Sequence, residues 1–66
     1  MKKNVFFSKM ALYEDSLETL AKHLGVTRQT LSQKIDGTAE FKRNEIEKII
    51  VRYELTPEET REIFFS

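Results

Sequence analysis

The sequence has no cysteine and no tryptophan, and among its 66 residues there are only one histidine, one proline and two glycines. Without cysteine the chain has no disulfide framework and no thiolate metal site, and a single histidine cannot complete a zinc site of the usual kind. We therefore predict one small domain over residues 1–66, held together by packing, with no metal and no cofactor.

Long apolar runs are also missing, since none approaches the roughly 20 residues of a membrane span. The opening Met1-Lys2-Lys3 is followed only by the short apolar segment Val5-Phe6-Phe7, which does not have the form of a secretory signal peptide. The sequence therefore predicts a cytoplasmic protein that does not contact a membrane.

Neither sign of charge is in excess, because eleven basic residues balance eleven acidic ones. Zero net charge argues against nucleic-acid binding, since proteins that bind nucleic acids usually carry a basic excess. The charge is unevenly spread, however: residues 1–34 hold six basic and three acidic residues, a net +3, and residues 35–66 hold the compensating −3. A polarised domain can turn a basic face to a partner, although ordinary scatter gives the same split.

Helical periodicity dominates what the sequence does contain. An amphipathic helix is predicted over about 15–24, with its N-cap at Asp15 or Ser16 and its end at Gly25. Asp15 and Glu18 have the spacing of a capping box. The apolar stripe of this helix consists of Leu17, Leu20, Ala21 and Leu24.

A second helix is predicted over about 28–35, with Thr27 as its N-cap and Gly37 just beyond its end. At about 100° per residue, only Leu31 and Ile35 point toward the core. The remaining positions are polar and face solvent.

Two further helices are predicted over about 44–53 and about 57–65. Thr56 is the expected N-cap of the last helix and Pro57 its first residue. The core of a monomer takes one of Phe64 and Phe65, which leaves the other for a dimer seam. In the helix over 44–53 the inward residues are Ile46, Ile49, Ile50 and Tyr53, and the outward ones are Glu45, Glu47, Lys48 and Arg52.

The first segment is ambiguous by propensity. Val5-Phe6-Phe7 favours a strand, whereas Phe6, Met10 and Tyr13 recur at helical intervals. We predict a helix over about 4–13. It is apolar around most of its circumference, which is more than one small core requires, and the surplus is suited to contact with another chain.

The second and third predicted helices, joined by a tight turn, form a helix-turn-helix over about 16–35. Ala21 lies where the helices approach and Gly25 at the bend. The segment from Leu20 to Ile35, LAKHLGVTRQTLSQKI, resembles the helix-turn-helix of the lambda Cro and lambda repressor family, also called the xenobiotic-response-element type. The small, turn and core positions of that family's pattern are occupied here by Ala21, Gly25, Val26, Leu31 and Ile35.

The flanking segments, 41–53, 55–59 and 62–65, look like small regulators from phages and mobile elements of Gram-positive bacteria. The resemblance implies an all-α, compact bundle of about five short helices that binds operator DNA as a symmetric dimer. One position departs from the family, in which many members have a phosphate-contacting glutamine where this chain has Leu17. Thr19 or the amide groups at the start of that helix are candidates to replace that contact.

The second helix of the motif has the residue chemistry of a base-reading element, and no acid lies between Thr27 and Ile35. Arginine can donate two hydrogen bonds to guanine, glutamine can pair with adenine, and serine is more permissive. Alternatively, these residues merely solvate a surface helix. The predicted base-reading residues are Arg28, Gln29, Ser32 and Gln33, and the predicted phosphate contacts are Thr19, Thr27, Thr30, Lys34, Lys42, Arg43 and Asn44.

Catalysis has no support in the sequence. His23 lies on a polar helix side without a partner ligand, no serine has a histidine–acid setting, and there is no glycine-rich phosphate loop. We therefore predict a phage or mobile-element transcriptional repressor, Cro-like and not an enzyme, that occupies a palindromic DNA operator as a homodimer and takes no small-molecule substrate. The alternatives are a protein-interaction module, such as an antirepressor, on the same scaffold, and an architectural factor that bends DNA.

Overall fold

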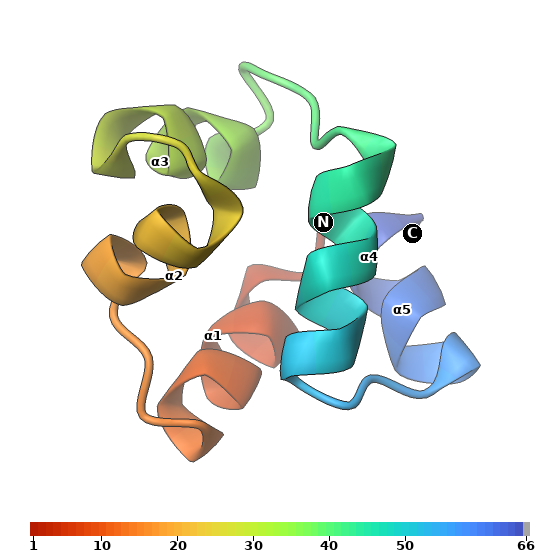
Figure 1. The fold of residues 1–66 in the computed structure, drawn as a ribbon. Helices are drawn as coiled ribbons and strands as arrows, with labels where there is room; N and C mark the ends of the chain where they lie inside the picture. The colour runs from red at the N-terminus through yellow and green to blue at the C-terminus, as the bar shows by residue number, and fades with distance from the viewer. Residues whose placement is uncertain (66) are drawn as a thin grey trace.

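The computed structural model describes residues 1–65, which fold into helices joined by short connections, with no strand among them. None of these helices is long and apolar enough to cross a membrane. Because residues 1–65 contain helices and no strand, the predicted all-α class is confirmed. The helices are α1 (Lys3–Leu12), α2 (Leu17–Leu24), α3 (Arg28–Asp36), α4 (Arg43–Arg52) and α5 (Pro57–Phe64), arranged as in Figure 1.

The first segment is a helix, as predicted, because two residues one turn apart anchor it in the core. Phe6 and Met10 are both buried, whereas Phe7 and Leu12 on other sides of α1 are exposed. Burial of two large apolar side chains stabilises the helix more than the strand propensity of its first residues opposes it.

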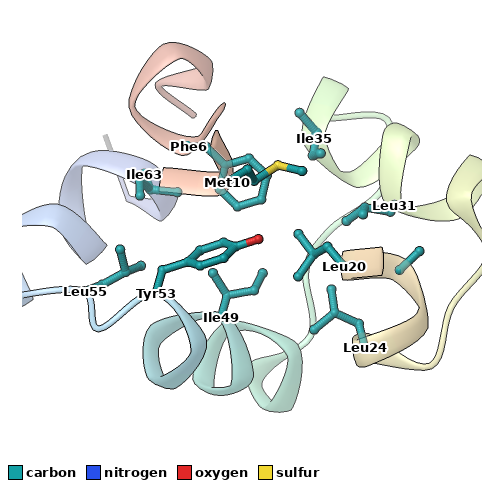
Figure 2. Packing of buried hydrophobic residues seen from close by; sticks show 11 residues of the cluster. Phe6, Met10, Leu20, Leu24, Leu31, Ile35, Ile49, Tyr53, Leu55 and Ile63 are labelled. Carbon is teal, nitrogen blue, oxygen red and sulfur yellow. The ribbon is translucent and has the colours of Figure 1, made fainter. Parts of the chain in front are cut away.

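The core lies where all the helices meet, with the Tyr53 ring at its centre (Figure 2). Phe6 and Tyr53 meet edge to face with ring centroids 6.3 Å apart, an arrangement that aromatic pairs favour. Leu55 packs in the connection after α4, as predicted, and Ile46 and Ile50, predicted as core, are only half-buried. The buried apolar residues are Phe6, Met10, Leu20, Ala21, Leu24, Leu31, Ile35, Ile49, Tyr53, Leu55 and Ile63.

Hydroxyl side chains cap three of the helices. Thr27 and Thr56 are N-caps as predicted, each accepting a backbone N–H three residues on. Of the two N-caps predicted for α2, Ser16 is confirmed: it forms a capping box with Thr19, with hydrogen bonds of 3.1 and 2.9 Å. The capping box predicted for Asp15 and Glu18 is therefore wrong by one residue. Asp15 is unavailable as a cap because its carboxylate bonds elsewhere.

Two corners of the chain have the same construction. Tyr13 is the C-cap of α1 and Tyr53 is the C-cap of α4. The glutamate that follows each tyrosine takes a left-handed conformation, with φ of 56° at Glu14 and 48° at Glu54. In both corners the next backbone N–H returns to a carbonyl five residues earlier, which closes the helix end.

The two corners also bind each other. The Tyr13 hydroxyl donates to Glu54 at 2.9 Å, the Tyr53 hydroxyl donates to Asp15 at 2.7 Å, and the two rings lie 5.4 Å apart. The connection between α1 and α2 and the connection between α4 and α5 therefore each supply one tyrosine donor and one carboxylate acceptor to the other.

Asp15 is the most heavily bonded side chain at these corners. Its carboxylate is buried and accepts two hydrogen bonds from the Arg52 guanidinium, at 2.6 and 2.7 Å, together with bonds from the Tyr53 and Thr19 hydroxyls. The bonds from Arg52 hold the pKa of Asp15 well below its usual 3.8, and those from Tyr53 and Thr19 lower it further, against the opposing effect of burial. Burial and the neighbouring Asp15 raise the pKa of Tyr53.

The last helix follows its prediction closely. Ile63 is fully buried, Phe64 is half-buried and Phe65, the residue after α5, is exposed, so the monomer core takes one of the two phenylalanines. An ion pair of 2.8 Å between Lys9 and Glu59 joins α5 to α1.

Candidate nucleic-acid interface

The α2–α3 pair lies at one end of the molecule, away from α5 (Figure 1). Its two helices are joined by the short turn from Gly25 to Thr27. Gly25 has φ of 77°, a conformation that costs a side-chain-bearing residue roughly 1 kcal/mol, and the Val26 N–H returns to the carbonyl of Ala21 at 3.0 Å. The glycine predicted at the bend therefore has the backbone role expected of it.

Apolar contacts hold α3 against the rest of the domain by one side only. Leu31 and Ile35 are buried, as predicted, among the apolar residues of α2 and α1 (Figure 2). The opposite side of α3 has no covering element, and its residues are available to a partner.

The exposed side of α3 carries three of the four predicted base-reading residues. Arg28, Gln29 and Gln33 are all exposed, whereas Ser32 is half-buried at the edge of the face. The one acid of α3, Asp36, lies at its C-terminal end and pairs with Lys3 at 3.1 Å. The face therefore presents guanidinium and amide groups without an unpaired carboxylate.

The start of α3 is closed by a pair of threonines. Thr27 accepts the N–H of Thr30 at 3.0 Å and donates its own hydroxyl to the Thr30 hydroxyl at 2.9 Å. The Thr30 hydroxyl keeps its proton for an external acceptor and remains a candidate phosphate donor. Thr27, also predicted to contact phosphate, has given its one proton to Thr30 and has none left for phosphate while this bond is intact.

Lys34 corrects the sequence prediction, because its ammonium group does not reach solvent. It forms an ion pair of 2.5 Å with Glu45, and the two side chains are only 6% and 4% exposed. A phosphate contact from Lys34 would require this pair to break. Lys34 is therefore no longer a candidate phosphate contact. Its role in the fold is to join α3 to the start of α4.

Glu45, predicted to face outward, is buried for the same reason. The same carboxylate oxygen that pairs with Lys34 accepts the backbone N–H of Lys42 at 2.8 Å, which caps α4. Burial alone raises the pKa of Glu45, but the hydrogen bonds from Lys34 and Lys42 outweigh it and lower the pKa below its usual value of 4.5. The carboxylate is therefore held in its charged form by partners within the fold.

Thr19 also has a structural role in place of the predicted phosphate contact. Its hydroxyl donates to Asp15 at 2.8 Å and accepts the N–H of Ser16 at 2.9 Å. Because a hydroxyl has one proton to donate, Thr19 has none left for phosphate while the cap is intact.

The remaining predicted contacts, Lys42, Arg43 and Asn44, are exposed at the N-terminal end of α4. This end of α4 and α3 lie on the same side of the molecule in Figure 1, joined by the connection after Gly37. Arg43 has a loose contact of 3.5 Å with Glu47, and both side chains are well exposed. Such a pair contributes about 0–1 kcal/mol, so the guanidinium is free to turn to another anion.

The interface thus consists of an exposed side of α3, a hydroxyl pair at its start and a basic segment at the start of α4. The Lys34–Glu45 pair, which was not predicted from the sequence, joins α3 to the start of α4. Across residues 1–65, no group of histidine and acidic side chains is arranged to hold a metal ion. Comparison with known proteins found no matching family model, no matching curated protein and no matching solved structure.

Proposed function

We propose that this chain binds double-stranded DNA in a sequence-specific manner and regulates transcription in the cytoplasm by occupying a palindromic operator as a homodimer. The α2–α3 pair acts as a helix-turn-helix, with α3 in the major groove. The activity is binding, with no chemical step.

The observation that carries the proposal is the exposed, carboxylate-free side of α3. Arg28, Gln29 and Gln33 supply the donors and acceptors that distinguish guanine and adenine in the major groove. A helix about 12 Å across fits a major groove about 12 Å wide. The basic start of α4 lies on the same side of the molecule, where it can meet the phosphates that flank the groove.

Selection of bound sequences from random duplexes tests the proposal as a whole. We expect enrichment of a short consensus with two-fold symmetry, since a homodimer reads two half-sites about one helical turn apart. Recovery of random sequence after repeated rounds, together with no shift of any duplex, would reject sequence-specific binding.

Arg28→Ala tests the base-reading role of α3. We expect a loss of about 1–3 kcal/mol of binding free energy on the selected operator, with relaxed preference at one base pair of each half-site. Fluorescence anisotropy on the operator and on a random duplex of equal length measures both effects. An equal loss on the two duplexes would exclude Arg28 from base reading.

Arg43→Ala tests the phosphate role at the start of α4, and it is the matched control for Arg28→Ala because it removes the same group from an exposed site. We expect binding to weaken by a similar factor on every duplex, and the slope of log affinity against log salt concentration to fall by about 1 for each chain. An unchanged salt slope in anisotropy titrations would remove Arg43 from the interface.

A protein-interaction module on the same scaffold is the second candidate. It is favoured by the zero net charge and by the engagement of Lys34 and Thr19 within the fold, which reduces the set of phosphate contacts. Titration of random genomic DNA at two salt concentrations separates the candidates, since recognition of a protein gives no steep phosphate-driven slope. A DNA-bending factor would instead change the mobility of circularly permuted fragments.

A further inference from the structure

The apolar stripe that holds α3 against the domain is narrow. Its buried apolar residues, Leu31 and Ile35, lie four positions apart and hence only about 40° apart around the helix axis. A surface helix usually buries a stripe at least about 100° wide. The apolar contacts of α3 alone therefore leave its rotation about its own axis poorly determined.

Lys34 widens the buried side of α3. It lies about 60° from Leu31, on the side away from Ile35, so that the three buried residues together span about 100° of the circumference. Gln29 and Gln33 lie opposite this arc and are exposed. The rotation of α3, and with it the direction of these side chains, therefore depends on where Lys34 is held.

One carboxylate oxygen of Glu45 holds Lys34 in place. Glu45 Oε1 accepts a hydrogen bond from the Lys34 ammonium at 2.5 Å and another from the backbone N–H of Lys42 at 2.8 Å. Within residues 1–65, no other hydrogen bond or ion pair joins a side chain of α3 to a side chain of α4. Both side chains of the pair are buried, so dissolved salt screens their attraction much less than that of an exposed pair.

The first turn of α4 carries the proposed phosphate contacts. Lys42 is the N-cap of α4, Arg43 and Asn44 follow it, and all three are exposed. Because the oxygen that holds Lys34 also holds the backbone of Lys42, the exposed side of α3 and the start of α4 are fixed relative to each other. Phosphate contacts set the register of a protein on a duplex, and base contacts then require the correct orientation of the recognition helix in that register.

We propose that Lys34, acting through Glu45, is a positioning residue for DNA recognition: the buried pair sets the rotation of α3 so that its side chains reach base edges while the start of α4 contacts the flanking phosphates. The inference rests on the proposed function, and neither residue of the pair touches DNA in it. A rotation of about 20° moves an atom about 5–6 Å from the helix axis by about 2 Å, which is more than a hydrogen bond tolerates. Loss of the pair is therefore expected to weaken base recognition rather than phosphate binding.

The double variant Lys34→Met with Glu45→Leu replaces the pair by apolar side chains and keeps the net charge. We expect its affinity for the selected operator to fall at least about tenfold, while its affinity for a random duplex of equal length stays within about threefold and the salt slope is unchanged. Fluorescence anisotropy at two salt concentrations measures these effects, and circular dichroism verifies the fold. A merely structural role would lower both affinities together, through the fraction of folded chain.

A second double variant, Lys34→Met with Glu45→Gln, separates the bond between the helices from the cap of α4. The glutamine oxygen can still accept the Lys42 N–H, so only the bond to α3 is lost. We expect the same selective loss of affinity for the operator as in the first double variant. Because the two variants differ in whether they keep the cap, an effect common to both does not arise from its loss.

The Lys9–Glu59 pair offers a matched control. Glu59 accepts the backbone N–H of Thr56 at 2.9 Å, which caps α5, and pairs with Lys9 of α1 at 2.8 Å. Lys9→Met with Glu59→Leu therefore removes an ion pair and a cap of the same kind from two helices that carry none of the proposed DNA contacts. We expect it to leave the ratio of operator affinity to random-duplex affinity unchanged.

The positioning role and the proposed function fail in different ways. A folded double variant at positions 34 and 45 that keeps the wild-type ratio of the two affinities, whether or not both affinities fall, overturns the positioning role. An equal change of that ratio in the Lys9 and Glu59 control also overturns it. In both cases the wild-type chain binds its operator and the proposed function stands. A wild-type chain that selects no sequence and shifts no duplex rejects the proposed function, and the positioning role with it.

Discussion

Glu45→Ala is expected to lower the free energy of unfolding by about 3–5 kcal/mol, because it leaves the Lys34 ammonium buried without a partner. It also removes the cap on the Lys42 N–H, which typically contributes about 1 kcal/mol. A chain of this length has a total stability of about 3–10 kcal/mol, so the variant is expected to be largely unfolded or close to it. Urea denaturation followed by circular dichroism measures the change.

Two controls distinguish the loss of the ion pair from the other effects of the substitution on stability, namely the change in helix propensity and the loss of packed side-chain volume. Glu47→Ala makes the same substitution at an exposed position of α4. Its free energy of unfolding is expected to stay within about 0.5 kcal/mol of the wild-type value. The double variant Lys34→Met with Glu45→Leu replaces the pair by apolar side chains and should regain most of the lost stability. If Glu45→Ala and Glu47→Ala have the same effect, the buried pair does not stabilise the fold.

Asp15→Asn is expected to lower stability at neutral pH by about 2–3 kcal/mol, less than the loss at Glu45 because Arg52 keeps some access to water. The pKa of Asp15 is depressed in the folded chain, so its contribution is complete above the usual value of 3.8. As the pH falls below that value, the unfolded chain takes up a proton before the folded chain does, and the contribution is lost progressively. Between pH 7 and pH 5 the difference between wild type and variant is therefore constant.

The measurement is urea denaturation of both proteins from pH 7 to pH 2. We expect the two stability curves to converge below pH 4. Asp36→Asn removes an exposed carboxylate and should follow the wild-type curve in shape. A constant gap between wild type and Asp15→Asn down to pH 2 would show that the carboxylate is not held in its charged form by Arg52.

The helices and their ends were predictable from the sequence because their signals are local. Thr27 and Thr56 precede helical periodicity, and Gly25 takes the positive φ that its position at the bend requires. Apolar spacing was also sufficient to identify Leu31 and Ile35 as the buried side of α3, and hence its polar side as the exposed one.

The polar contacts between distant segments were not predictable in the same way. Lys34 and Glu45 lie at the margins of their apolar stripes, and neither position alone indicates that the other residue is near. A partial signal was present, since Glu45 lies one turn before the buried Ile49 and Lys34 directly precedes Ile35. Asp15 was one of the two N-caps predicted for α2, with Ser16, because nothing local indicates that its partner is Arg52, 37 residues away.

The reciprocal tyrosine bonds between the corners after α1 and α4 have a consequence for how the chain opens. Neither half of the domain can separate from the other without losing the bonds of both Tyr13 and Tyr53, together with the contact between their rings. Opening at these two corners is thereby disfavoured, so that the backbone amides of the two connections are expected to exchange more slowly than those of the connection between α3 and α4, which has no such bonds. Proteolysis within these two connections is expected to be slow while the domain remains folded.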